Sequence, residues 1–331
     1  DVAMKHSIPA YFTPTDFWTI CPTNQLLLMD NSMCKGPSCA AGNCVKHIGM
    51  LTRDEKTKNY LSMIPTPVAD VLTFLTKKYF TQRHPLALEI AAMVNRHKTN
   101  VARVNQLTGI FSPTRLMTDA LVANGVKSDL IQSSAYGIDV SGYDNAQSRT
   151  GTARTIGFIG TLSEPKGCHV LINAFKQLNL PDLRLKIYGS FEHYPDYAAG
   201  LKTLAAECDA IEFCGTFPNH QIADVLSELD ALVVPSLWYE NTPLVVYSAL
   251  AARCPVIASN FAGMSEMVRH EDNGLLFSAG DSNDLAETLR LLATTVDLLP
   301  RLSANCQPPK STVQYVDELI TAYQKNLAAN G

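Results

Sequence analysis

A carboxylate placed just before a predicted helix is the feature of this chain best suited to chemistry. Residues 231–234 form a short apolar run that predicts a strand, and Glu240 lies in the polar loop after it. Asn241 and Thr242 are predicted to cap the following helix, with Pro243 in its first turn. A helix start favours a phosphate, whereas a carboxylate beside a phosphate needs neutral partners such as sugar hydroxyls. The pattern predicts a site for a sugar attached to a phosphate, with a solvated loop carboxylate as the alternative for Glu240.

A second candidate is the turn GTLSEPKG, residues 160–167, between a predicted strand and a predicted helix. Gly160 permits a close backbone approach, and Lys166 offers a positive charge to a diphosphate. The turn has neither the Rossmann G-x-G-x-x-G pattern nor a P-loop, which argues against nicotinamide cofactors and ATP hydrolysis. Taken alone, Lys166 as an ordinary surface lysine is the simpler interpretation.

These candidates lie in a regular alternation of elements. Strands are predicted at the apolar runs TIGFIG, LRLKIYG, AIEFCG, ALVVP, PVIAS and NGLLF, with amphipathic helices between them. Such alternation predicts a parallel sheet covered on both faces, a doubly wound fold. Ligands of these sheets bind beyond the carboxyl ends of the strands, where both candidates would lie.

The segment from 231 to 259 resembles the donor-binding signature of retaining glycosyltransferases of family 4, which have the GT-B architecture. That signature carries a Glu, seven residues and a second Glu. Glu240 matches the first position, while Ser248 stands at the second, where relatives hold the ribose of the nucleotide. The resemblance implies an α/β GT-B fold of two Rossmann-like doubly wound domains that face a cleft.

The same resemblance implies roles for further residues. Relatives have an Arg where this chain has Thr161, so Lys166 would carry the diphosphate alone, and Gly215 with Phe217 would hold the nucleotide base. Glu240 and Lys166 are the catalytic candidates. The implied donor-binding residues are Gly160, Thr161, Lys166, Gly215, Phe217, Glu240, Asn241, Thr242, Pro243, Leu244 and Ser248.

The start of the chain, DVAMKHSIPAYFTPTDFW, resembles a strand pair from the middle of the family's first domain. We therefore expect the N-terminal domain to be incomplete. Thr15 stands where relatives have a His that touches the donor sugar, and Asp16 is a candidate acceptor contact. A turn or capping role is the alternative for Asp16. The domains are predicted as 1–150, 151–305 and a C-terminal helix, 306–331, that crosses back to the first domain.

Four cysteines, Cys21, Cys34, Cys39 and Cys44, fall in a segment without helical or strand periodicity. Four thiols close together can bind structural zinc. Their spacing lacks the paired C-x-x-C of typical zinc sites, so a loop with reduced thiols is the alternative.

Basic residues gather where two helices are predicted between residues 66 and 106. Lys77, Lys78, Arg83 and His84 follow the first of them. Cations at a helix end complement the helix dipole, and they also suit anionic lipid headgroups. Peripheral contact with an anionic membrane is one of these two interpretations.

The composition narrows the function classes. The 331 residues are 46% apolar and carry a net charge of -4, which gives no sign of nucleic-acid binding, although residues 1–150 are net +4 and the rest net -8. No signal peptide and no run of 18 apolar residues is found, and nine cysteines fit a reducing compartment. We expect a cytoplasmic protein.

The resemblance implies a glycosyltransferase of the hexosyltransferase type that takes a UDP- or GDP-sugar and keeps the anomeric configuration. The acceptor would be a glycan or a lipid-linked molecule in cell-surface polysaccharide synthesis. No Asp-x-Asp pair is present, which predicts a metal-independent donor site without a required cofactor. The alternatives are a GT-B sugar-nucleotide epimerase and a non-catalytic nucleotide-sugar-binding subunit.

Overall fold

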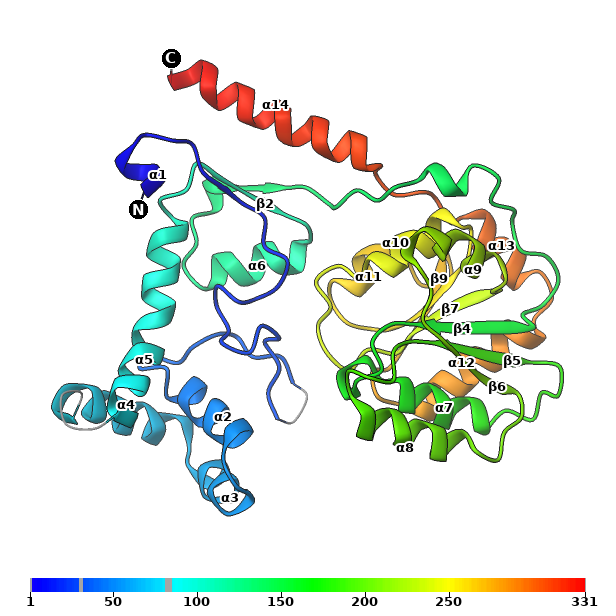
Figure 1. The fold of residues 1–331 in the computed structure, drawn as a ribbon, viewed down its shortest axis with the longest axis horizontal. Coiled ribbons are helices and arrows are strands. Elements are labelled where there is room, and N and C mark those ends of the chain that lie inside the picture. The colour runs from blue at the N-terminus through cyan, green and yellow to red at the C-terminus, as the bar shows by residue number, and fades with distance from the viewer. Residues whose placement is uncertain (1, 30–31, 81–84, 331) are drawn as a thin grey trace. The chain divides into compact units, whose positions relative to one another are not determined.

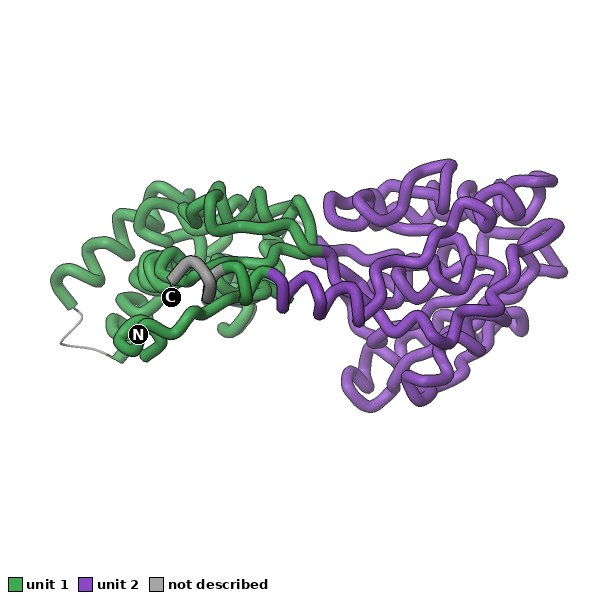
Figure 2. Tube along the Cα trace, turned by 90° about the horizontal axis from the view of Figure 1, so that it is seen from above, with its two compact units in different colours: residues 1–134, 322–331 green, residues 135–321 purple. Residues whose placement is uncertain are grey.

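The structure is a computed structural model that describes residues 2–29, 32–80 and 85–330. The chain forms two compact units, one of residues 1–134 with 322–331 and one of residues 135–321 (Figure 2). None of the helices in the described part of the chain is long and apolar enough to cross a bilayer.

Unit 2, residues 135–321, is built on a parallel sheet of six strands in the order β6-β5-β4-β7-β8-β9 (Figure 1). All six predicted strands are present: β4 Thr155–Ile159, β5 Arg184–Tyr188, β6 Ile211–Gly215, β7 Ala231–Val234, β8 Val256–Ser259 and β9 Gly274–Phe277. The strand order reverses its direction between β4 and β7. The predicted doubly wound fold of this half is confirmed, and its ligand crevice is expected at that reversal.

Helices cover both faces of this sheet, because successive residues of each strand point to opposite sides. In β7, Ala231 and Val233 join one buried apolar cluster, together with α7, α8 and α12, while Leu232 and Val234 join the other, with α9, α10 and α11. The helices are α7 Cys168–Lys176, α8 Pro195–Ala205, α9 Ile222–Ser227, α10 Leu244–Ala251, α11 Met264–Met267, α12 Ser282–Thr294 and α13 Leu298–Ala304.

Two flanking segments complete unit 2. The amide of Ile138 donates to the carbonyl of Lys310 over 3.1 Å, and the amide of Thr312 donates to the carbonyl of Ile138 over 2.8 Å. The guanidinium group of Arg149 donates to the carbonyls of Leu226, Leu229 and Ala252. These contacts explain why the compact unit runs from 135 to 321, whereas the domain limits predicted from the sequence fall at 150 and 305 and stay a prediction.

Unit 1 has a parallel sheet in the order β1-β2-β3, of Tyr11–Phe12, Gly109–Ser112 and Ile131–Ser133. Its helices are α1 Val2–Lys5, α2 Gly42–Thr52, α3 Glu55–Met63, α4 Thr66–Phe80, α5 Pro85–Val104 and α6 Arg115–Ala123. The two helices predicted between residues 66 and 106 are α4 and α5. The last helix, α14 Thr312–Asn330, contributes Tyr323 to this unit, where its ring lies 4.5 Å from that of Tyr11.

One predicted strand of unit 1 is wrong. The first apolar run belongs to the short helix α1 and not to a strand pair, and the amides of His6 and Ile8 bond back to the carbonyls of Val2 and Ala3. Only the second run, Tyr11–Phe12, pairs in the sheet, against Gly109 and Ile110. A three-residue apolar run does not distinguish a strand from a turn of helix.

Candidate functional site

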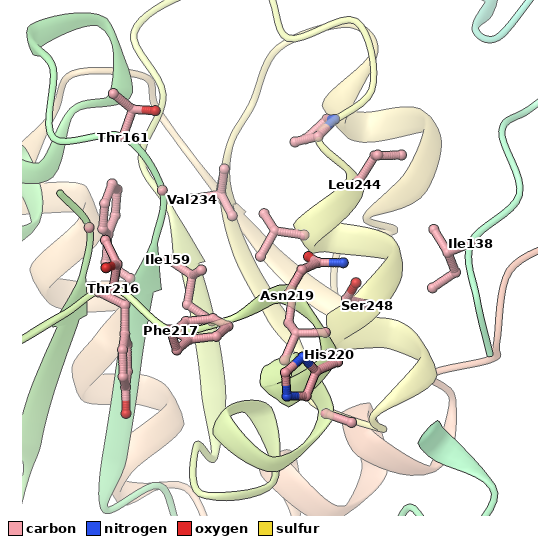
Figure 3. A pocket seen from close by; sticks show the side chains of 18 of the residues that line it. Ile138, Ile159, Thr161, Thr216, Phe217, Asn219, His220, Val234, Leu244 and Ser248 are labelled. Atoms are coloured by element: carbon pink, nitrogen blue, oxygen red, sulfur yellow. The ribbon is translucent and has the colours of Figure 1, made fainter. Parts of the chain in front are cut away.

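A cavity of about 970 Å³ lies at the carboxyl ends of the central strands of unit 2. Gly160 follows β4, Gly189 follows β5 and Ser236 follows β7, and all three line the cavity. Figure 3 shows the lining side chains converging from different elements, with Thr161 at the end of β4, Phe217 and His220 beyond β6, and Leu244 and Ser248 on α10. The cavity is therefore where a doubly wound sheet places its ligand.

Most of the predicted donor-binding residues come together here. Nine of the eleven line the cavity, namely Gly160, Thr161, Lys166, Gly215, Phe217, Glu240, Pro243, Leu244 and Ser248. Asn241 and Thr242 are not among the lining residues. The two acceptor-side candidates, Thr15 and Asp16, belong to unit 1. There the Asp16 carboxylate accepts a hydrogen bond from the Trp18 amide over 2.7 Å, as its alternative role in a turn predicts.

The centre of the site is the carboxylate of Glu240. Glu240 is 6% exposed, so its interpretation as a solvated loop carboxylate is wrong. Its Oε1 atom accepts hydrogen bonds from Lys166 Nζ over 2.5 Å and from Ser236 Oγ and Trp238 Nε1, each over 2.8 Å. The interpretation of Lys166 as an ordinary surface lysine is wrong as well.

The ion pair sets the electrostatics of the cavity. The Lys166 side chain remains 28% exposed, and its ammonium group lies 5.3 Å from the centre of the Trp238 ring. A phosphate that binds here would contact a lysine that is already paired with a carboxylate. Removal of either partner would leave the other charge in a largely buried place without a counter-charge. The geometry allows an anion on the open side of Lys166 and hydroxyl groups near Glu240.

A glycine explains how the turn 160–167 brings its lysine to the loop after β7. Gly167 has φ of 70°, and a Cβ atom there would lie 1.9 Å from the carbonyl oxygen of Pro235. The amide of Leu237 also bonds to the carbonyl of Pro165 over 2.7 Å. Gly160, which the sequence pattern predicted to permit a close backbone approach at the diphosphate, lines the cavity, and a Cβ there would meet only the Phe158 ring, at 3.5 Å. The contact between the turn and the loop after β7 requires a glycine at Gly167.

The start of α10 corrects another prediction. The N-cap of this helix is Pro243, without a side-chain cap, because an extended backbone at Pro243 delays the first helical residue to Leu244. Thr242 Oγ1 donates to the carbonyl of Asn241 and does not cap. The helix still points its first turn at the cavity, since Pro243, Leu244 and Val245 line it.

Several polar and aromatic side chains in the cavity or in contact with its residues were missed in the sequence. Tyr143 and Ser248 share a side-chain hydrogen bond, and burial raises the pKa of the Tyr143 phenol despite that bond. Phe217 packs edge-on against Tyr188, with ring centres 5.5 Å apart. Ser236 and Trp238 stand within four residues of Glu240, so their proximity in sequence was a usable signal. Tyr143 gave no such signal, because it is far from Ser248 in the sequence.

The four cysteines do not form the predicted zinc site. In the part of the chain that the structure describes, no group of three or more His, Cys, Asp or Glu side chains is arranged to hold a metal ion. The Cys39 thiol instead donates to Asp70 Oδ2 over 3.2 Å, and Cys21 Sγ lies 3.1 Å from Thr23 Oγ1. All four are free cysteines.

Known proteins are similar to this chain in sequence. Residues 143–306 match the family described as Glycosyl transferases group 1. The chain is 28% identical over 245 residues to the amylovoran biosynthesis glycosyltransferase AmsK of Erwinia amylovora, covering 69% of this chain and 58% of that protein. It is 30% identical over 184 residues to a D-inositol 3-phosphate glycosyltransferase of Stackebrandtia nassauensis, covering 52% of this chain and 41% of that protein. The chain spans about half the length of the curated relatives it matches.

Solved structures share the fold. The crystal structure of HepE from Anabaena in complex with UDP and glucose matches with a TM-score of 0.60 at 17% identity, over 95% of this chain and 98% of that one. Sucrose-phosphate synthase from Thermosynechococcus elongatus matches with a TM-score of 0.57 at 20% identity, over 78% of this chain and 66% of that one. The fold is accordingly that of the GT-B glycosyltransferases. Residues 143–306, just under half of the chain, are similar to the group 1 glycosyl transferase family.

Proposed function

We propose that unit 2 binds a nucleoside diphosphate sugar and that the protein transfers this sugar to a glycan or lipid-linked acceptor with retention of configuration, as in family 4. The observation that carries the proposal is the pairing of Lys166 with buried Glu240 on the wall of the cavity. The ammonium group can bind the phosphate of a sugar phosphate, and the buried carboxylate can accept hydrogen bonds from the hydroxyl groups of its sugar.

Each residue of the site has its own role in the proposed reaction. Lys166 binds the diphosphate together with the amides at the start of α10 and stabilises the negative charge that develops on the leaving group. Glu240 accepts hydrogen bonds from the sugar hydroxyls, and Ser236 and Trp238 hold its carboxylate in place. Charge stabilisation by these groups makes the reaction independent of a bound metal.

The donor is proposed to be a UDP- or GDP-hexose. A cavity of about 970 Å³ is large enough for such a molecule. Crystals of HepE contain UDP-glucose, which favours UDP, and relatives named for amylovoran and colanic acid biosynthesis favour a role in cell-surface polysaccharide synthesis. Free thiols at all nine cysteines suit the cytoplasm, where we place the reaction.

A sugar-nucleotide epimerase is the second candidate, because His193 and His220 line the same cavity and could move a proton. Conversion of a nucleotide sugar to its epimer without any acceptor would favour this candidate. Donor binding without hydrolysis, transfer or epimerisation would favour a binding subunit.

A donor panel tests the proposal. Thermal unfolding of the chain is followed with UDP, GDP, UDP-hexoses and GDP-hexoses, since a ligand at a hundred times its Kd stabilises by about 2.7 kcal/mol. We expect stabilisation by one nucleotide class, lost in Lys166→Ala and kept in Lys202→Ala, which removes an exposed lysine of α8 outside the cavity. If no donor or nucleotide stabilises the chain, the proposal fails.

A further inference from the structure

Helix α4 of unit 1 has its large apolar side chains on the outside. Its three buried residues are Ala69, Asp70 and Thr73, all small or polar. The exposed residues Val68, Val71, Leu72, Leu75 and Tyr79 recur at helical spacing and are between 40% and 57% exposed. We call these five residues the α4 stripe. They form one apolar face along a helix of 15 residues, which is about 22 Å long.

The packing of α4 against α2 explains why its small residues are buried and its large apolar residues are exposed. A Cβ atom at Gly42, the first residue of α2, would lie 2.4 Å from the backbone nitrogen of Asp70 and 2.5 Å from the carbonyl carbon of Ala69. The two helices therefore touch backbone to backbone, which leaves room for small side chains only. Asp70 fixes the contact, because its carboxylate accepts from the Gly42 amide over 2.8 Å and from Ser38 Oγ over 2.6 Å. The large side chains are held on the opposite face, away from α2.

The helical segment that contains the stripe carries a positive net charge. Residues 42–104 contain ten Lys and Arg against four Asp and Glu, a net charge of +6. Of those acids, Asp70 is buried and Asp54 caps α3. Lys78 lies beside the stripe, with its ammonium group 5.1 Å from the Tyr79 ring and 6.0 Å from the Phe74 ring. Arg83 and His84, which follow in the same basic group of the sequence, lie outside the described residues.

We infer that the α4 stripe docks on an anionic lipid surface, with its apolar side chains in the boundary between headgroups and acyl chains and Lys78 among the headgroups. An apolar face flanked by a cation such as Lys78 and by aromatic rings is the pattern of a helix that lies in the plane of a bilayer. A second copy of the chain fits less well, because a symmetric contact would bring two faces of the same positive charge together. This inference does not depend on the function proposed for unit 2.

Flotation with vesicles tests the inference. The full chain is mixed with vesicles of phosphatidylcholine and phosphatidylglycerol, or of phosphatidylcholine alone, at low salt. We expect binding to the anionic vesicles, a loss of about tenfold in the double variant Leu72→Ser/Leu75→Ser, and a loss of at least fivefold in Lys78→Glu. The matched controls are Leu291→Ser, an exposed leucine of α12, and Lys127→Glu, an exposed lysine of unit 1, and both should bind as the parent does.

A second measurement distinguishes insertion from simple charge attraction. Tyr79→Trp places a fluorophore in the stripe, and its emission, after subtraction of the parent with Trp18 and Trp238, should shift to the blue on anionic vesicles. Absence of vesicle binding by the parent, or equal losses in Leu72→Ser/Leu75→Ser and Leu291→Ser, overturns the inference. So does a dimer in light scattering that the double variant converts to a monomer, because the occupant would then be a second copy.

Discussion

Two helices of this protein are rich in large apolar residues, but one buries these residues and the other exposes them. In α10, Leu244–Ala251, every residue from Val246 to Ala251 is buried, whereas α4, Thr66–Phe80, buries only three of its 15 residues. The first packs against the sheet of unit 2 and begins at the cavity. The second lies against the first turn of α2 and exposes its apolar stripe. Apolar content alone therefore does not say whether a helix builds a core, a binding site or an outer surface.

This difference in burial follows from where a neighbouring backbone comes close to each helix. The loop before α10 is held by Gly167, whose missing side chain admits the carbonyl of Pro235, and the helix packs large residues such as Val246 and Leu250 against β7 and β8. At α4 the close approach occurs at the helix itself, through Gly42, so the large residues are turned to the outer face. The two tryptophans, Trp18 in unit 1 and Trp238 in unit 2, report on the two regions separately.

The largest effect is expected from Gly167→Ala. The new Cβ would lie 1.9 Å from a backbone oxygen at positive φ, so we expect about 3 kcal/mol of destabilisation or more. The loss should appear in urea unfolding followed by Trp238 in a Trp18→Phe background, together with loss of nucleotide binding. Gly151→Ala is the control, since Gly151 also has positive φ but a Cβ atom there would meet no other atom within 4 Å. Equal stability of the two variants would contradict the claim that the contact between Gly167 and Pro235 requires a glycine.

The second effect concerns the contact that turns the α4 stripe outward. Burial alone would raise the pKa of Asp70, but hydrogen bonds from Ser38, Gly42, Cys39 and Ala40 outweigh burial and lower the pKa below its ordinary value. Asp70→Asn should cost about 1.5–3 kcal/mol in unit 1 at neutral pH, read from Trp18 in a Trp238→Phe background. Asp129→Asn, at an exposed carboxylate, should cost little.

The sign of the pH dependence follows from the lowered pKa. The stabilisation by Asp70 is complete above the pKa of the unfolded carboxyl group, about 3.9, and is lost as the pH falls through the lower folded value. The difference in stability between the parent and Asp70→Asn should therefore shrink on acidification below about pH 4. A constant difference across that range would show that the Asp70 carboxylate is not what holds α2 to α4.

A comparable effect on binding is expected at Lys166. Lys166→Ala should weaken a nucleoside diphosphate by about 1.5–3 kcal/mol in calorimetry, because a charge-assisted contact is lost. The variant should leave flotation with anionic vesicles unchanged, since Lys166 lies in unit 2. Unchanged nucleotide affinity would remove Lys166 from the diphosphate site.

The smallest effect is expected at the hydroxyl pair of Tyr143 and Ser248. Ser248→Glu should tighten a ribonucleotide donor by about tenfold relative to its dideoxy analogue, because a carboxylate would replace a neutral hydroxyl at the proposed ribose position. Tyr143→Phe should weaken the ribonucleotide by about threefold and spare the dideoxy form. If neither variant changes the preference between the two sugars, the ribose does not bind at this pair.

The sequence predicted unit 2 far better than unit 1 for physical reasons. Short apolar strands separated by helices are local signals, and the residues after successive parallel strands meet at one edge, so Lys166, Gly215 and Glu240 were correctly placed around one cavity. The direct pairing of Lys166 with Glu240 was not predictable, because it depends on the turn at Gly167. In unit 1 the inverted packing of α4 depends on the contact between Gly42 and Asp70, which are 28 residues apart, and no periodic pattern reveals it.

Calorimetry on Glu240→Gln tests the central claim most directly. The claim is that Glu240 serves the sugar and Lys166 the diphosphate of one bound donor. The isosteric change keeps the shape of the side chain and removes its charge, and the free nucleoside diphosphate and the complete nucleotide sugar are titrated in parallel. We predict that the affinity for the sugar donor falls while that for the free nucleotide is kept or rises, because Lys166 is released from its partner. Equal weakening of both ligands would contradict the claim.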